Sequence, residues 1–229
     1  PVCSSPTIWG HSLFIGSDDG GLYALSTETG SRLWRYETGA PVRSTPAVYR
    51  NNIYFGNEAG DFYCLDMFGK QKWHYRAKRA ITSSPFVDDQ LALFASMDAS
   101  LYAFDARMGW EQWRYRMVKG SISSPCMTYP QVYLGAVDGN IYCVDARNGR
   151  EVWTYHTDHQ VTGSPLVVGP YLFCGSVDGC FYCLDAKMGS LHWKYQTGGP
   201  ITGGLAEADE VVYFGSVDHR LYAFPSWGM

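Results

Sequence analysis

Aspartate recurs at one position of the sequence, and this set of carboxylates is the first feature that could do chemistry. Five aspartates share the position, and Ala59 occupies the second of its six occurrences: Asp19, Asp98, Asp138, Asp178 and Asp218. A ring of carboxylates is suited to holding a cation or to acid–base catalysis. Aspartate beside glycine is also what hairpin turns favour. Turn formation accounts for all five without a ligand, and the same interpretation applies to a second series: Asp66, Asp105, Asp145 and Asp185.

A second group with metal-binding chemistry is the run His156-Thr157-Asp158-His159, which holds two imidazoles and a carboxylate. Zinc binds such groups, but structural zinc sites draw their ligands from separated positions. Three ligands from four contiguous residues fit that spacing poorly. We therefore predict no metal site here.

The seven cysteines are odd in number and lack framework spacing, which argues against a disulfide-stapled fold and mildly favours a reducing, cytoplasmic compartment. Cys180 and Cys183 are three apart, so on a strand they point to opposite faces. The better pair is Cys174 with Cys183. If the hairpin is centred on Asp178-Gly179, these two face each other with Cα atoms about 4.5 Å apart, close enough for a strained disulfide. The alternative is two free thiols packed as small hydrophobic groups.

An internal repeat of 39 or 40 residues determines where all these side chains must lie. Tryptophan marks five copies: Trp34, Trp73, Trp113, Trp153 and Trp193. Tyrosine marks six: Tyr23, Tyr63, Tyr102, Tyr142, Tyr182 and Tyr222. The copies cover the whole chain, with limits near 1–39, 40–78, 79–119, 120–159, 160–199 and 200–229.

One copy contains four extended runs and no helical periodicity, which predicts an antiparallel meander. In the fifth copy the runs are Val161–Val168, Tyr171–Val177, Cys180–Asp185 and Ser190–Thr197. A single sheet that is apolar on both faces must stack against neighbours. Radial stacking predicts an all-β, six-bladed β-propeller of four-stranded antiparallel blades, formed as a single domain over 1–229. The repeated tryptophan should then pack between adjacent blades.

The sixth copy is shorter than the others. After Arg220–Phe224 the sequence ends at Pro225–Met229 without a Trp-containing run. We therefore expect the last blade to lack its outer strand. Either that blade exposes an edge that invites pairing with another chain, or a longer parent chain supplies the strand.

The repeat resembles a known family. The residues that carry the resemblance are Gly175–Gly179, Phe181–Ala186, Gly189, Trp193-x-Tyr195-x-Thr197-Gly198 and Gly203-x-Leu205. They are similar to the PQQ-like β-propeller repeat of the quinoprotein alcohol dehydrogenase-like superfamily, and the resemblance extends over all six copies. The resemblance implies the propeller fold, and it allows a periplasmic location.

The same resemblance implies a choice of functions. Quinoprotein dehydrogenases of the superfamily hold PQQ and calcium in an eight-bladed propeller and bring an adjacent Cys-Cys pair and a stacking tryptophan. This sequence has no Cys-Cys pair, two blades fewer and no tryptophan on an axial strand. The remaining uses are scaffold propellers, such as the outer-membrane assembly lipoprotein, and sensor propellers of bacterial Ser/Thr kinases. A non-catalytic member without cofactor is therefore expected.

Basic side chains gather on the connections that run from rim to axis, on the same face as the Asp-Gly turns. They are Arg76, Lys78, Arg79, Arg116, Lys119, His156 and His159, and Arg43 lies on an axial strand. The opposite connections are acidic, with Asp88, Asp89, Glu207, Asp209 and Glu210. We hypothesise that the basic sector binds an acidic segment of a protein partner or an anionic small molecule; the alternative is an ordinary solvated surface.

Several function classes are excluded or left open by composition. The net charge of −4 makes nucleic acid an unexpected partner. No run approaches the roughly 18 apolar residues that would span a bilayer, and localisation stays open.

The small axial residues Ser44, Ser83 and Ser123 suit a narrow wet channel, but no Ser, His and carboxylate recur together as a catalytic triad. We predict a non-enzymatic interaction, scaffold or sensing module; the alternatives are a fragment of a quinoprotein oxidoreductase and a purely architectural or engineered repeat scaffold.

Overall fold

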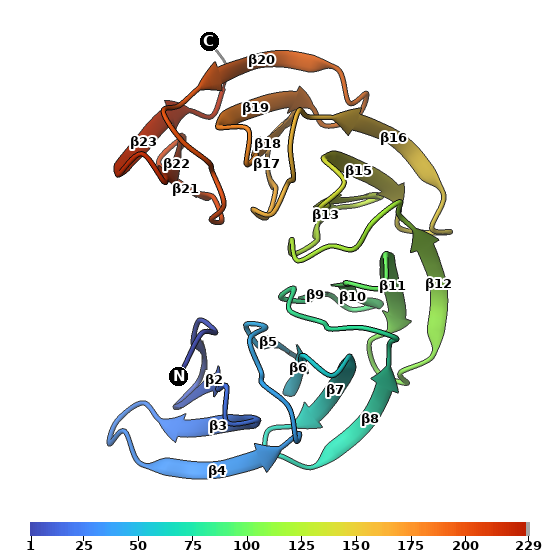
Figure 1. Cartoon of the computed structure of the whole chain (residues 1–229). Coiled ribbons are helices and arrows are strands. Elements are labelled where there is room, and N and C mark those ends of the chain that lie inside the picture. Colours follow the sequence, from blue (N-terminus) through green and yellow to red (C-terminus); the bar gives the residue numbers. More distant parts are fainter. Residues whose placement is uncertain (228–229) are drawn as a thin grey trace. The chain divides into compact units, whose positions relative to one another are not determined.

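The computed structural model describes residues 1–227, and every regular element within that range is a β-strand. Figure 1 shows these strands as successive small sheets along the chain. All sheets are antiparallel meanders in which each strand pairs with the next one along the sequence. The all-β prediction is confirmed, as are the four-stranded sheets and the three-stranded last one.

The chain divides into two compact units, and the first covers Pro1–Arg114. Its strands are β1 (Thr7–Trp9), β2 (Ser12–Gly16), β3 (Gly21–Ser26), β4 (Arg32–Glu37), β5 (Ala47–Tyr49), β6 (Asn52–Gly56), β7 (Asp61–Asp66), β8 (Gln71–Arg76), β9 (Phe86–Val87), β10 (Leu91–Ser96), β11 (Ser100–Asp105) and β12 (Glu111–Arg116). They form three sheets of four strands. The boundary between the units falls inside β12.

The second unit begins at Tyr115. Its further strands are β13 (Cys126–Thr128), β14 (Gln131–Gly135), β15 (Asn140–Asp145), β16 (Glu151–His156), β17 (Leu166–Val168), β18 (Tyr171–Gly175), β19 (Cys180–Asp185), β20 (Leu191–Gln196), β21 (Ala206–Ala208), β22 (Val211–Ser216) and β23 (Arg220–Pro225). The last sheet, β21 to β23, has no fourth strand among the described residues.

Aromatic side chains fill the spaces between consecutive sheets of a unit. In the first unit Phe62 of β7 stacks on Phe94 of β10 with ring centroids 3.9 Å apart. In the second, Phe181 of β19 stacks on Phe214 of β22 at 4.1 Å. All four rings are essentially inaccessible to water. Burial of such rings between two sheets is the main stabilising contribution, because neither sheet could shield them alone.

The repeated tryptophan joins neighbouring sheets, as the sequence predicts. The indole N–H of Trp34 donates to the carbonyl of Met67, 2.9 Å away in the following sheet. Trp153 does the same to Ala186 at 3.0 Å. The large ring contributes buried area and the N–H fixes its orientation.

The first strand of each sheet is shorter than the extended run predicted, and serine side chains bond to the neighbouring strand before it begins. The Ser44 hydroxyl accepts from the Gly56 N–H (2.8 Å) and donates to the Gly56 carbonyl (3.2 Å). Ser83 makes the same pair of bonds to Ala95. Both serines are fully buried. They therefore satisfy backbone groups of their own sheets, and the prediction that they line a wet channel is wrong.

Candidate functional site

The turn aspartates, defined as Asp19, Asp98, Asp138, Asp178 and Asp218, anchor tyrosines four residues further on. The tyrosine hydroxyl donates to the carboxylate at 2.6 Å for Tyr102 and Asp98 and at 2.8 Å for Tyr182 and Asp178. The other three turn aspartates accept the same bond. The Tyr222 hydroxyl is the main reason that the pKa of Asp218 lies below its usual value. The Asp218 carboxylate is thus an ionised acceptor at neutral pH.

The same carboxylates also hold the connections that arrive from the preceding sheet. Asp98 accepts the backbone N–H of Lys78, and Asp138 accepts that of Lys119, both at 3.1 Å. Asp178 and Asp218 accept from the corresponding connections of the second unit. The position is therefore a structural anchor, which agrees with the turn interpretation and extends it. Sequence reasoning missed the tyrosine contact, although the Asp-x-x-x-Tyr spacing recurs in five copies.

The second sheet, where Ala59 replaces the turn aspartate, uses a different arrangement. The Asn57 side-chain oxygen accepts the backbone N–H groups of Ala59 and Asp61, at 3.0 and 2.8 Å. The Asp61 carboxylate is buried, and it pairs with His74 at 2.9 Å and Arg76 at 3.0 Å. Arg76 is therefore paired with Asp61, while its own side chain stays 64% exposed.

Replacing Tyr182 by phenylalanine is expected to lower the free energy of unfolding by about 1–2 kcal/mol, because it deletes a hydrogen bond to a carboxylate. The matched control is Tyr63→Phe. No hydrogen-bond partner of the Tyr63 hydroxyl is found among residues 1–227, so this change should cost less than about 0.5 kcal/mol. Urea titrations of both variants measure the difference, and equal effects would contradict a structural role for the aspartate–tyrosine contact.

The remaining predicted binding residues divide into paired and open side chains. Arg43 is paired with Asp18 (2.9 Å) and Glu58 (2.7 Å), and its side chain is 44% exposed. His156 contacts the Asn140 side chain at 2.9 Å. Arg116 is exposed at the end of β12, directly before the connection that leads to Lys119.

Four predicted side chains are exposed and have no side-chain partner within the described range 1–227: Lys78, Arg79, Lys119 and His159. Lys78 and Arg79 lie together on the connection after β8, in the first unit. Lys119 and His159 lie on two successive connections of the second unit. Together these four residues are called the open basic connections. In each unit these residues lie on the same side as the turn aspartates of that unit, because Asp98 in the first unit and Asp138 in the second bind the backbones of such connections.

The predicted Cys174–Cys183 disulfide is wrong, because the hairpin register differs by one residue from the one expected. Cys174 pairs with Tyr182, and Cys183 with Phe173. The turn has three residues, Val177 to Gly179, with Gly179 at a φ of +83°. A three-residue loop with a left-handed glycine is a common hairpin connection, and it shifts the register relative to a two-residue loop. Cys174 and Cys183 consequently face opposite sides of the sheet, in separate core clusters.

All seven cysteines are free, and Cys3 is the exposed one. Burial raises the pKa of the Cys64, Cys143 and Cys183 thiols to about 12. Buried thiols with a raised pKa stay protonated and react slowly. We therefore expect a chromogenic disulfide reagent at pH 8 to label Cys3 first and all seven thiols only after denaturation. Five reactive thiols in denaturant would instead show that a disulfide exists.

Metal-binding and membrane-spanning features are not found in the part of the chain that the structure describes. No three His, Cys, Asp or Glu side chains within residues 1–227 gather as metal ligands would. No helix in that range is long and apolar enough to cross a bilayer.

Comparisons with known proteins were made by sequence family and by structure. The family model described as outer membrane protein assembly factor BamB matches residues 1–66, 18–136 and 137–226. BamB from Moraxella catarrhalis has a similar structure, with a TM-score of 0.83 and 23% identity over 96% of this chain and 71% of its own. The computationally designed Ika8 protein matches with a TM-score of 0.87 and 16% identity over 97% of this chain and 70% of its own. No curated protein matches the sequence. At these identities the structural likeness shows the fold.

Proposed function

The chain belongs to the family of the outer membrane protein assembly factor BamB and is a PQQ-like β-propeller, and on this premise we propose that it is a non-enzymatic protein-interaction module. We take each sheet to be one blade, as the sequence period predicts, with the sixth blade lacking its outer strand. The name of the family describes an assembly factor, which supports a role in binding proteins. The fold alone is compatible with many functions, so the proposal has to rest on a surface.

The observation that carries the proposal is a difference, on the turn-aspartate side of each unit, between the turn aspartates and the basic side chains. The turn aspartates are acceptors of tyrosine and backbone donors, and Asp19 is also close to Arg35. The open basic connections have no such internal partners among residues 1–227. Lys78 and Arg79 in the first unit and Lys119 in the second are therefore positive charges available to another molecule, and Asp158 is an exposed carboxylate beside His159. We propose that the partner contributes a solvent-exposed segment rich in Asp and Glu.

The runner-up function, a quinone-dependent oxidoreductase, requires carboxylates that can bind calcium. Calcium needs six to eight oxygen ligands in protein sites. The turn aspartates are the recurring carboxylates of this face, and their hydrogen bonds to tyrosines and backbones support the proposal that no such cofactor is used. Adding pyrroloquinoline quinone with calcium should leave the quinone absorbance unchanged and give no alcohol-dependent dye reduction. A saturable spectral change would favour the oxidoreductase.

A defined peptide tests the interaction proposal. We expect a fluorescently labelled, flexible peptide with about ten Glu and Asp residues to bind, and a peptide with Lys at the same positions not to bind. Binding should weaken steeply between 20 mM and 300 mM salt, because screening shortens the range of exposed charges. Fluorescence anisotropy measures both. No binding of either peptide would support the purely architectural alternative.

A further inference from the structure

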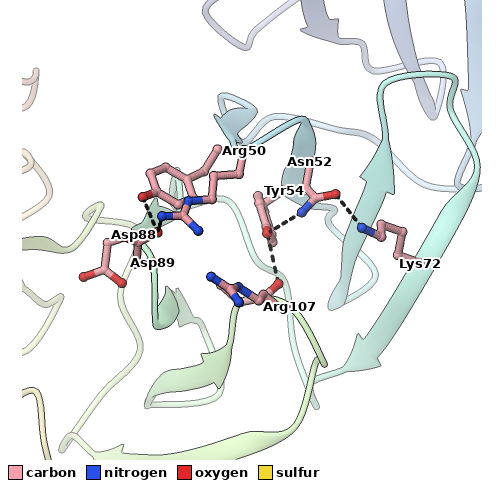
Figure 2. A pocket seen from close by; sticks show the side chains of 9 residues that line it. Arg50, Asn52, Tyr54, Lys72, Asp88, Asp89 and Arg107 are labelled. Carbon is pink, nitrogen blue, oxygen red and sulfur yellow. Dashed lines mark hydrogen bonds and ion pairs between the residues drawn. The ribbon is translucent and has the colours of Figure 1, made fainter.

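A cavity of about 330 Å³ opens in the first unit, between its second and third sheets. It lies at the turns β5–β6, β9–β10 and β11–β12, the ends of the strands opposite the turn aspartates. Figure 2 shows the charged side chains around it. The volume is at the lower end of the range of about 300–1,000 Å³ that small-molecule sites occupy.

Three cations line this cavity: Arg50, Lys72 and Arg107. Arg50 is paired with Asp89 at 2.5 Å. The Lys72 ammonium donates to the side-chain oxygen of Asn52 at 2.8 Å, a neutral partner. The Arg107 guanidinium has no side-chain partner within residues 1–227, and in Figure 2 it points into the same space as Arg50. Two of the three positive charges are therefore not neutralised by a carboxylate.

The anionic side chains of the cavity are engaged elsewhere. One oxygen of Asp88 accepts the backbone N–H groups of Gln90 and Leu91, at 2.8 and 2.7 Å. Asp89 accepts the Tyr49 hydroxyl at 2.7 Å in addition to Arg50. Asp88 thus holds the β9–β10 turn, and Asp89 links that turn to the neighbouring β5–β6 turn. No ion pair joins them to Lys72 or Arg107 within residues 1–227, and the three cations of the lining exceed its two carboxylates by one charge.

The floor of the cavity contains a buried amide. Asn52 is only 8% exposed. One of its N–H groups reaches the Tyr54 hydroxyl at 3.4 Å, a long hydrogen bond, and the second has no partner in the described chain. Tyr54 is itself fixed, because its hydroxyl donates to the Ala106 carbonyl at 2.9 Å. A buried donor without a partner is costly unless a ligand or water satisfies it.

The second unit contains the same cleft without these features, so the fold does not require them. There Gln131 and Tyr133 occupy the places of Asn52 and Tyr54, and the Gln131 amide donates to the Lys187 carbonyl at 3.3 Å across the cleft. Lys187 corresponds to Arg107 and is the single cation lining that cleft. Val152 occupies the position of Lys72, directly before the repeated tryptophan.

We propose that the cavity between the second and third sheets binds a small organic dianion with two acid groups, about the size of succinate. One acid group would lie on the Arg107 fork, which matches the two oxygens of a carboxylate. The other would accept from Lys72 and from the free N–H of Asn52. Within the first unit this site is at the ends of the strands opposite Lys78 and Arg79, so it stands or falls independently of the proposed protein interaction.

Calorimetric titration of the whole chain with succinate tests the site, with butyrate and inorganic phosphate as comparison probes. We expect succinate to bind saturably and butyrate at least about tenfold more weakly, which corresponds to about 1.4 kcal/mol. Arg107→Ala and Lys72→Ala should each weaken succinate binding about tenfold or more, and Arg107→Lys less, because it keeps the charge but loses the fork. Lys187→Ala, at the corresponding place in the second unit, should bind normally.

The location is checked by NMR, in which succinate should shift the Asn52 side-chain amide of the native chain. All substituted side chains are exposed, so the variants should fold. Three outcomes would overturn the proposal: no saturable binding of succinate, binding that survives Arg107→Ala, or phosphate that binds as well as succinate. The last would mean a site for one oxyanion instead of two acid groups.

Discussion

Replacing Lys78 and Arg79 together by glutamate is expected to weaken binding of the acidic peptide about a hundredfold at low salt. The two side chains share one connection, are exposed and have no internal side-chain partner within residues 1–227. Their reversal converts two attractive charges into two repulsive ones. Charges at an interface act mainly on the rate of association and on the rejection of wrong partners. The loss of peptide affinity should therefore be greatest at low ionic strength, where charges are least screened.

The control for this experiment changes the same net charge elsewhere. Lys70 and Lys187 are exposed on turns at the opposite end of the strands. Lys70→Glu with Lys187→Glu should leave the affinity for the peptide within about threefold, because each side chain lies at the end of the strands opposite the turn aspartates of its own unit, and exposed charges are screened over about 8–10 Å. Equal losses in both double variants would mean that the peptide responds to net charge alone.

Gly175→Ala is expected to destabilise the chain by about 1–3 kcal/mol or more, as overpacking does in a filled core. A methyl group on Gly175 would lie 2.2 Å from Cγ2 and 2.8 Å from Cβ of Ile201, which the next sheet packs over the glycine. Ile201 is fully buried, so it has little room to move. Gly56 under Ile81 and Gly135 under Val161 show the same close approach.

Gly215 is the matched control, because it occupies the same place in the last sheet and a methyl group there would meet no atom within 4 Å. Gly215→Ala should be neutral, or stabilising by about 0.4–1 kcal/mol through the unfolded chain. Combining Gly175→Ala with Ile201→Ala should cost less than the sum of the single changes, since the two residues compete for one space. Denaturant unfolding measures all four variants; strictly additive costs would show that the contact with Ile201 is not the cause.

Much of the fold follows from the period of the sequence. The spacing of the tryptophans and tyrosines predicts six antiparallel sheets, and the missing Trp-containing run predicts the three-stranded last sheet. The hairpin register is harder to predict, because Asp178-Gly179 is compatible with turns of two or three residues. That one-residue difference placed Cys174 and Cys183 on the same face in the prediction and on opposite faces in the structure.

The candidate sites follow from the sequence less completely. Exposed charges can be counted along the chain, but their internal partners come from other strands. Arg43 pairs with Glu58, and Arg76 with Asp61, across distances in sequence that carry no local pattern. The cavity around Arg107 likewise combines turns from two sheets. An alignment of the copies would have identified Lys72, because Val152 at the same position of another copy shows that the repeat does not require a charged side chain there.

Hydrogen exchange of the backbone amides, with and without the acidic peptide, tests the central claim most directly. If the open basic connections bind an acidic partner segment, the peptide should slow exchange at the connection that carries Lys78 and Arg79. The turns on the opposite face, at Lys70 and Lys187, should exchange as before. Protection of those opposite turns alone, or no protection anywhere at saturating peptide, would contradict the claim.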